Sequence, residues 1–312
     1  MVDGAKQAGR VAAAQLPWRS LNASGGVVSL GQGSRGADVA VGAWEHKLGR
    51  AGDFPGRLKT WRQKRRLSQL ELALAANVSQ RHLSFLESGR ASPSRLMIQQ
   101  LSDTLDIPLR DRNELLIAAG FAPIFAARGL DDPDLAQVMG AVRLLLGNHA
   151  PFPGVAVDRA WNIRLANAPF DRLIEVFGAD VWQRIGGGAP NLMRLFFHPG
   201  GLRPLVANWT QVAPLLWRRA QREAEALDGQ DMAAVLAALA PLQDAQTLGG
   251  AADAALLPVL PLEIARDGVR LALFGVIATF GTAQDVTADE LRIELLFPAD
   301  VASEALLRGL AG

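Results

Sequence analysis

The chain has 312 residues, of which 49% are hydrophobic and 20% charged, and its formal net charge is +1. This length and composition are typical of two soluble globular domains. The absence of cysteine excludes disulfides, thiolate metal ligands and cysteine nucleophiles. The histidines lack zinc-ligand spacing, so we expect no metal site. No apolar run reaches the roughly 18 residues of a membrane span and no signal peptide is evident, which predicts a cytoplasmic protein.

Basic residues are concentrated in one short segment. Between Pro55 and Arg95 there are nine basic residues and only two acidic ones, so the remainder of this nearly neutral chain is acidic. A compact basic module joined to an acidic remainder indicates that one domain meets a polyanion. A solvated helix face would give the same charge pattern, so charge alone does not decide between the two interpretations.

Residues 1–53 are rich in Gly, Ala and Ser and show no sustained apolar period. Such a composition does not offset the entropy of ordering a chain. We therefore expect a disordered N-terminal arm, or a stretch that lies upstream of the start codon used in the cell.

The pattern of residues 54–120 predicts a domain of five short helices. Ser68 precedes Glu71 by three residues, which is the spacing of a capping box at the start of the second helix. Asn77 tolerates the left-handed backbone of a sharp turn, and Ser79 is a suitable cap for the third helix. A small all-α domain follows from these signals.

Two further signals bound the last helices of this segment. Ser92 and Pro93 are typical of the N-cap and first-turn proline of a fourth helix. Pro108 ends that helix, because proline has no backbone N–H to donate. A fifth helix is then expected from Arg110 to Ala119.

Residues 57–105 contain a recognisable set of short sequence motifs. They are Leu67-Ser68-Gln69, Ala73, Val78-Ser79, Leu83-Ser84, Glu87-Ser88-Gly89 and Pro93-Ser94. In this order and spacing the segment resembles the lambda-repressor-like, XRE-type helix-turn-helix domain. Asn77 is a departure, because the family usually has glycine there, but asparagine is the next-best residue for that backbone.

The resemblance implies that the third helix enters the DNA major groove, which is about 12 Å wide, and presents its N-terminal side chains to base edges. The exposed residues there are Gln80, Arg81 and Ser84, with His82 on the flank. Arginine suits guanine and glutamine suits adenine, each through paired hydrogen bonds. Each of these residues has the alternative of being an ordinary solvated surface group.

A second set of residues is expected to hold the DNA backbone. Gln69 resembles the family position that contacts the backbone and braces the recognition helix. Lys64, Arg65, Arg66 and Arg90 are expected to meet phosphates, since arginine and lysine supply most such contacts.

The second half of the chain has a mixed pattern. Residues 121–150 read as a linker and a connecting helix that begins near Pro133. Residues 151–312 then show short strands with interleaved helices, and Arg266-Asp267-Gly268 gives a strong hairpin signal. The pattern predicts an α+β domain with an antiparallel sheet.

Three segments of this second domain carry a further resemblance. They are Val155–Phe170, Asn191–Trp209 and Phe280–Asp300. Together with the preceding helix-turn-helix, they resemble the C-terminal ligand-binding domain of MmyB-like regulators, a PAS-like fold. The resemblance implies that this domain holds an apolar small molecule, with fatty acids as the candidate class, and no other cofactor.

The residues themselves allow a cavity of this kind. A half-sheet lined by apolar residues can close over a lipid chain, although each one could equally pack in a filled core. These residues are Val155, Val157, Ile163, Leu165, Phe274, Val276 and Ile277. Four other residues are the candidate ligand contacts: His198, Arg203, Asn208 and Trp209. His198 and Arg203 suit a carboxylate head group, while a salt bridge within the domain is the alternative role of Arg203.

The sequence as a whole predicts a homodimeric transcriptional regulator that binds a double-stranded DNA operator and an apolar effector. The main alternative is a constitutive repressor whose second domain only dimerises. An enzyme tethered to DNA is a third interpretation. No Ser/His/acid spacing or phosphate-binding loop supports it, so we expect no catalytic residues and no enzymatic activity.

Overall fold

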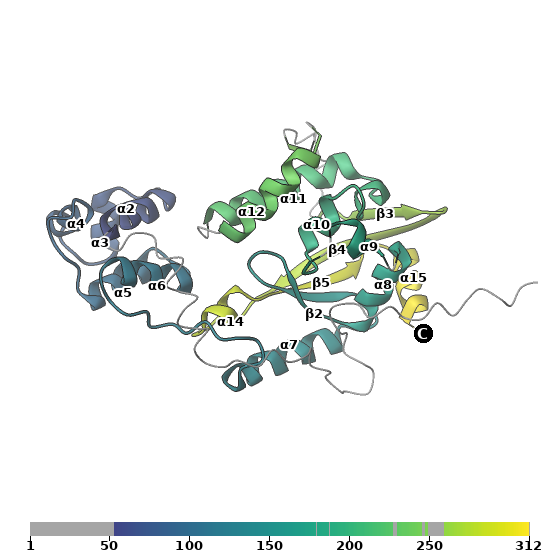
Figure 1. Ribbon diagram of the computed structural model, residues 1–312, viewed down its shortest axis with the longest axis horizontal. Coiled ribbons are helices and arrows are strands. Elements are labelled where there is room, and N and C mark those ends of the chain that lie inside the picture. The colour runs from purple at the N-terminus through teal and green to yellow at the C-terminus, as the bar shows by residue number, and fades with distance from the viewer. Residues whose placement is uncertain are drawn as a thin grey trace, which may run out of the picture.

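The computed structural model describes residues 53–178, 180–186, 188–226, 230–244, 247–248 and 259–311. The expected N-terminal arm lies, except for Asp53, outside these residues. A small helical domain and a larger sheet-containing domain lie side by side along the longest axis of the molecule (Figure 1). The fold class predicted from the sequence is thus confirmed.

The helical domain is built around one buried apolar core. Its helices are α2 (Phe54–Lys64), α3 (Gln69–Ala75), α4 (Gln80–Glu87), α5 (Arg95–Thr104) and α6 (Leu109–Ala118). Leu58, Leu72, Leu83 and Leu101, each from a different helix, are at most 1% exposed. Because short helices gain most of their stability from burying such a stripe, the core holds all five in place.

The predicted helix boundaries at α3 and α4 are confirmed. The Ser68 hydroxyl accepts from the Glu71 amide at 3.1 Å, and Glu71 accepts in return from the Ser68 amide, which completes the capping box. Asn77 has a φ of 50°, so the turn uses the left-handed backbone expected of it. Ser79 caps α4 by accepting from the His82 amide.

The predicted start of the fourth helix is wrong by two residues. Its N-cap is Ser94, whose hydroxyl accepts from the Met97 amide at 3.2 Å, and Pro93 lies outside the helix. Both Ser92 and Ser94 are acceptable caps by residue type. The helix begins at the later one, and it still buries Ile98 and Leu101.

The larger domain contains a five-stranded antiparallel sheet. Its strands are β1 (Gly154–Val157), β2 (Ile163–Ala166), β3 (Leu262–Arg266), β4 (Val269–Ala278) and β5 (Arg292–Pro298), in the order β2-β1-β5-β4-β3. The predicted hairpin joins β3 to β4, where Asp267 and Gly268 both have positive φ. Two such residues suit the twist of the flanking strands.

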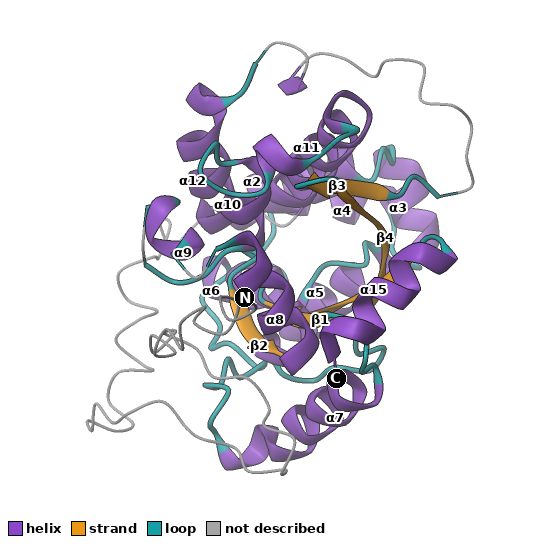
Figure 2. Cartoon of the chain, turned by 90° about the vertical axis from the view of Figure 1, so that its right-hand side faces the viewer, coloured by secondary structure: helices purple, strands orange, loops and turns teal. Residues whose placement is uncertain are grey.

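Helices cover both faces of this sheet. They are α7 (Ala136–Asn148), α8 (Ala168–Phe177), α9 (Val181–Arg184), α10 (Leu192–Phe197), α11 (Trp209–Ala226), α12 (Gln230–Leu239), α14 (Val286–Glu290) and α15 (Val301–Ala311). Single turns of 3-10 helix lie at η1 (Pro133–Leu135), η2 (Arg203–Leu205) and η3 (Ala240–Leu242). α7 packs under one face, while α10, α11 and α12 lie over the other (Figures 1 and 2).

The two faces of the sheet belong to two separate cores. Val155 and Val157 pack among the helices of the α11 side, whereas Ala156 packs against α7. The expectation that seven apolar residues line one cavity is therefore wrong in part. Leu165 and Phe274 pack on the α7 side. Strand alternation places Val276 on that side too.

A bulge explains the position of Leu165. The pairing register of β1 with β2 shifts between Ala156 and Val157, so Ile163 and Leu165 reach different cores although they are two residues apart. An extra residue in one strand locally breaks the two-residue alternation.

Asn167 links the first strands to the helix that follows. Its side-chain oxygen accepts from the amides of Gly154 at 2.9 Å and Phe170 at 3.1 Å. Its amide group donates to the carbonyl oxygens of Leu146 and Phe152. Asn167 is 2% exposed, so water does not replace these partners.

Replacing Asn167 by alanine leaves several buried backbone groups without partners. Each costs free energy when desolvated, so N167A should lower the free energy of unfolding by about 3 kcal/mol. Urea denaturation of the full chain measures this loss. Q284A is the control, because the exposed Gln284 side chain donates only to a neighbouring carbonyl. Equal stability of the two variants would contradict the proposed role of Asn167.

Candidate nucleic-acid interface and ligand-binding domain

Helix α4 presents one face to solvent because its other face is fixed in the core. Leu83 and Leu86 are fully buried, and Ser79 caps the first turn. Gln80 and Arg81 are exposed, while His82 and Ser84 are half-buried. The predicted base-reading residues thus gather at the outward N-terminal end of this helix. The helix lies on the side of its domain away from the sheet (Figure 1).

A buried ion pair anchors the other end of α4. Arg62 of α2 donates from two nitrogens to the Glu87 carboxylate at 2.6 and 2.9 Å, and its third nitrogen donates to the Leu67 carbonyl. Gln69 of α3 donates to the same carboxylate at 2.8 Å. Three helices therefore meet at Glu87, which the sequence analysis named as part of the helix-turn-helix motif but not as their common hydrogen-bond acceptor. Gln69 braces α4 through this contact.

The electrostatics of Glu87 follow from this arrangement. Burial by itself raises the pKa of the Glu87 carboxyl, but the hydrogen bonds from Arg62 and Gln69 outweigh it and hold the pKa below its usual value. The pair also raises the pKa of Arg62. Both groups are therefore charged at neutral pH.

Two of the predicted DNA contacts share one aromatic ring. The guanidinium carbons of Arg81 and Arg90 lie 5.4 and 5.5 Å from the centre of the Phe85 ring. Cation–π attraction at such distances restricts long side chains without using their hydrogen-bond donors. Among the described residues neither guanidinium donates a hydrogen bond to an acceptor, so both arginines can donate to an anionic or base-edge partner.

The basic residues at the end of α2 and just after it make different contacts. Lys64 is exposed, with its ammonium 4.7 Å from the centre of the Trp61 ring. Arg66 is exposed and has a positive φ of 58°. Arg65 donates to the Leu105 carbonyl at 2.6 Å and to the Asp106 carbonyl, which holds it against the end of α5.

The four candidate ligand contacts in the larger domain all have partners within the domain. Arg203 donates to Asp244 at 3.0 Å and to the Leu242 carbonyl. The Arg203 guanidinium lies 5.3 Å from the Trp209 ring centre, so these two residues are brought together. His198 accepts from the Gly200 amide.

Asn208 and Trp209 lie at the start of α11. Asn208 donates to the Pro261 carbonyl and accepts from the Glu263 amide, which ties this end of the helix to β3. The Trp209 indole donates to Thr247, and its ring stacks on Phe196 at 5.2 Å.

The structure adds a charged cluster that sequence reasoning missed. On α11, Glu223 accepts from Trp161 at 2.9 Å, from Arg292 at 2.7 Å and from Arg219 at 2.9 Å. Arg219 also donates to Glu294 at 3.1 Å. Burial raises the pKa of Glu294, and Arg219 opposes that rise. Arg292 and Glu294, two residues apart on β5, were the signal in the sequence that could have indicated this cluster. A strand at the solvent-facing edge of a sheet has the same spacing of charges, so the signal is not specific.

Across the part of the chain that the structure describes, no three His, Asp or Glu side chains are placed to hold a metal ion. No helix in those same ranges is both long and apolar enough to cross a membrane.

Two family models match this chain. A helix-turn-helix model matches residues 58–111, which include α3 and α4. The model of the MmyB-like transcription regulator ligand binding domain matches residues 138–310. The fold and these matches define a DNA-binding transcription regulator with a ligand-binding domain. Because the second match spans more than half of the chain, the protein belongs to the MmyB-like transcription regulators. A search among curated proteins finds no match.

The Glu87 contacts generate a prediction about stability. E87Q removes the negative charge that pairs with the buried Arg62 side chain, and breaking a buried pair by removing one partner costs about 3 kcal/mol. The pKa of Glu87 is lowered in the folded state. Its stabilising contribution is therefore present above its unfolded-state pKa and is lost as the pH falls through the folded one.

Urea unfolding at pH 7 and at decreasing pH measures both effects. The matched control is E114Q, because the Glu114–Arg57 pair has the same 2.6 Å distance but is about one-third exposed. Such a surface pair contributes less than about 1 kcal/mol. If E87Q and E114Q lose equal stability at pH 7, the anchoring role of Glu87 is wrong.

Proposed function

We propose that this regulator binds a specific operator in double-stranded DNA as a homodimer and that an apolar ligand in its larger domain changes the affinity for the operator. The observation that carries the DNA-binding part is helix α4. It is capped at one end, anchored by Glu87 at the other, and exposes Gln80 and Arg81. A helix held in this way fits the major groove with its N-terminal side chains at the base edges.

The charge of the domain supports the same proposal. The segment from Pro55 to Arg95 has nine basic and two acidic residues. Glu87 is neutralised by Arg62, and Lys64, Arg66, Arg81 and Arg90 are exposed. Neutralising phosphates with such groups releases counterions and drives association. Arg65 is held at the end of α5, so we leave it out of the phosphate contacts.

A homodimer follows from the amount of sequence that one helix can read. A single recognition helix contacts too few base pairs to select one site in a genome, and a second copy related by a two-fold axis doubles the number. The two α4 helices then lie about 34 Å apart, and the operator is an inverted repeat.

Arg81 is the residue whose loss should reduce specific binding most. R81A should weaken binding to the operator by about 1–3 kcal/mol and change binding to random DNA little. K64A should weaken both alike and reduce the slope of log affinity against log salt by about one. Fluorescence anisotropy with an operator selected from a random DNA pool gives both values. An unchanged operator affinity in R81A would show that α4 is not the base-reading helix.

The ligand part of the proposal rests on the sheet face under α11. The alternation of β4 places Gly275 and Ile277 on this face, beside Leu296 and Glu294 of β5. Ile277 is 38% exposed although it points to the helix-covered side. The described helices thus leave apolar surface uncovered here, which suits the tail of an amphiphile. Arg203, beside Trp209, and His198 are the groups we assign to its head.

Chain length should control ligand affinity. Each buried methylene contributes about 0.8 kcal/mol, so the affinity for saturated fatty acids should rise with length until the space is filled. Titrating lipid-stripped protein with a series of increasing length, with and without operator DNA, measures this rise and the coupling. R203A should change affinity less than removing several methylenes does, because the gain at a polar head is offset by desolvation.

Two results would favour the alternative, a constitutive repressor whose larger domain only dimerises. One is an affinity that does not depend on chain length. The other is fatty-acid binding that leaves operator affinity unchanged, because a ligand with equal affinity for both states shifts no equilibrium.

A further inference from the structure

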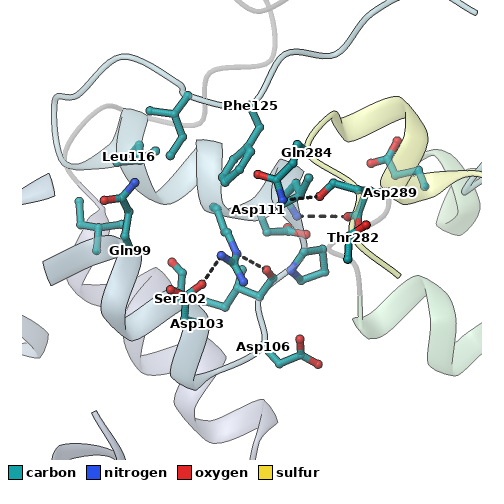
Figure 3. A pocket seen from close by; sticks show the side chains of 18 of the residues that line it. Gln99, Ser102, Asp103, Asp106, Asp111, Leu116, Phe125, Thr282, Gln284 and Asp289 are labelled. Atoms are coloured by element: carbon teal, nitrogen blue, oxygen red, sulfur yellow. Dashed lines mark hydrogen bonds and ion pairs between the residues drawn. The ribbon is translucent and has the colours of Figure 1, made fainter. Parts of the chain in front are cut away.

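A cleft lies between the two domains, which also contact each other through α6 and α14. The cleft has a volume of about 1380 Å3 and lies between α5 and α6 on one side and residues 280–292 on the other. In Figure 3, Ser102, Asp103 and Asp111 line the DNA-binding side, and Thr282, Gln284 and Asp289 line the other. The domains touch where α6 meets α14.

Asp289 caps a helix of the other domain. The N-cap residue of α6 is Pro108, whose side chain accepts no hydrogen bond. Instead the Leu109 amide donates to the Asp289 carboxylate at 3.3 Å, from a residue 180 positions away. Burial raises the pKa of Asp289, and the Leu109 amide opposes that rise. A helix start needs such an acceptor, and here the ligand-binding domain supplies it.

Glu290 makes the second and stronger contact. Arg110, in the first turn of α6, donates to both Glu290 oxygens at 2.5 and 2.8 Å, and Arg159 donates to one of them at 3.1 Å. A cation in the first turn opposes the helix dipole. Glu290 offsets this unfavourable charge from across the domain boundary, and it is mostly buried, with a 13% exposed side chain.

The connecting chain runs along the same short helix. The Val286 amide donates to the Ala126 carbonyl at 2.8 Å, and the Thr287 hydroxyl donates to the Arg128 carbonyl at 2.7 Å. Arg128 in turn donates to Asp285 at 2.9 Å. The linker, α6 and α14 thus form one continuous contact.

The chain leads from this contact directly into the ligand-binding domain. Leu291 is 2% exposed and packs in the core on the α7 side. Arg292 begins β5 and donates to Glu223 of α11. The consecutive residues Glu290, Leu291 and Arg292 therefore connect α6 to α11, the helix that covers the proposed ligand face.

The contact does not cover the recognition helix. α4 lies on the side of its domain away from α14, so the DNA-reading face stays open (Figure 1). A contact of this kind cannot act by blocking DNA. It fixes instead the direction in which α4 points relative to the ligand-binding domain.

We propose that Glu290, together with Asp289, is the positioning residue that sets the orientation of the DNA-binding domain and transmits ligand-driven movement of α11 to it. The proposal deepens the function proposed above and rests on it for the signal, but not for the docking contact itself. In a dimer, a fixed orientation raises the effective concentration of the second α4 at its half-site, and a loose one lowers it.

The docking contact is tested without DNA or ligand. Hydrogen exchange of the full-length protein should be faster in E290Q at residues 109–113 and in the linker at 121–130, by about tenfold or more, because these amides open locally. R110Q changes the DNA-binding side of the same contact and leaves the Glu290–Arg159 pair in place, so it should speed hydrogen exchange in the same residues. The matched control is E304Q, since Glu304 pairs with Arg308 on the exposed face of α15. Exchange in E290Q and R110Q equal to wild type would overturn the docking role.

The positioning role is tested with the operator selected from the random pool. E290Q should bind a single half-site within about twofold of wild type but the full operator about tenfold more weakly, since only the second contact depends on orientation. E290D keeps the carboxylate and should recover part of the affinity for the full operator that E290Q loses. Equal weakening on both DNAs, or none, would overturn the positioning role. If wild type itself selects no operator, the proposed function fails, and hydrogen exchange still decides the docking contact.

Discussion

The buried charge of Glu87 is the constraint on which the DNA-binding domain depends. This carboxylate ends α4 and receives hydrogen bonds from α2 and α3, so three helices share one acceptor. A desolvated charge is tolerated only when its partners are in place, which makes the arrangement of these helices nearly unique. The direction of α4, and with it the exposure of Arg81, follows from that junction together with the burial of Leu83 and Leu86 in the core.

The ligand-binding domain also contains a buried carboxylate that depends on a charged partner. Its sheet is mostly apolar on the face under α11, yet Glu294 is buried there with Arg219 as its partner. The position of α11 over β5 is therefore fixed by charge as well as by packing. A ligand on the uncovered surface beside Ile277, where we propose that it binds, would lie next to this cluster, whose charged groups continue through Arg292 toward the DNA-binding domain.

Buried charge also connects the two halves of the molecule. Arg110 is in an unfavourable place for a cation at the start of α6, and Glu290 compensates for it from the other domain. Surface ion pairs contribute little, but this one is mostly removed from water on the Glu290 side. The hydrogen bonds and ion pairs between α6, the linker and α14 thus help to fix the relative placement of the domains.

The sequence alone determined much of the local structure and the family. Caps such as Ser68 and Ser79, the turn at Asn77 and the Asp267-Gly268 hairpin could all be predicted, because each depends on residues a few positions apart. The roles of the charged residues could not. Arg62, Arg65 and Arg81 look alike in the sequence, but Arg62 is buried, Arg65 is tied to α5, and Arg81 is exposed beside the Phe85 ring. Only tertiary structure decides this, because Glu87 lies 25 positions from Arg62 and Leu105 lies 40 positions from Arg65, and 180 positions separate Arg110 from Glu290.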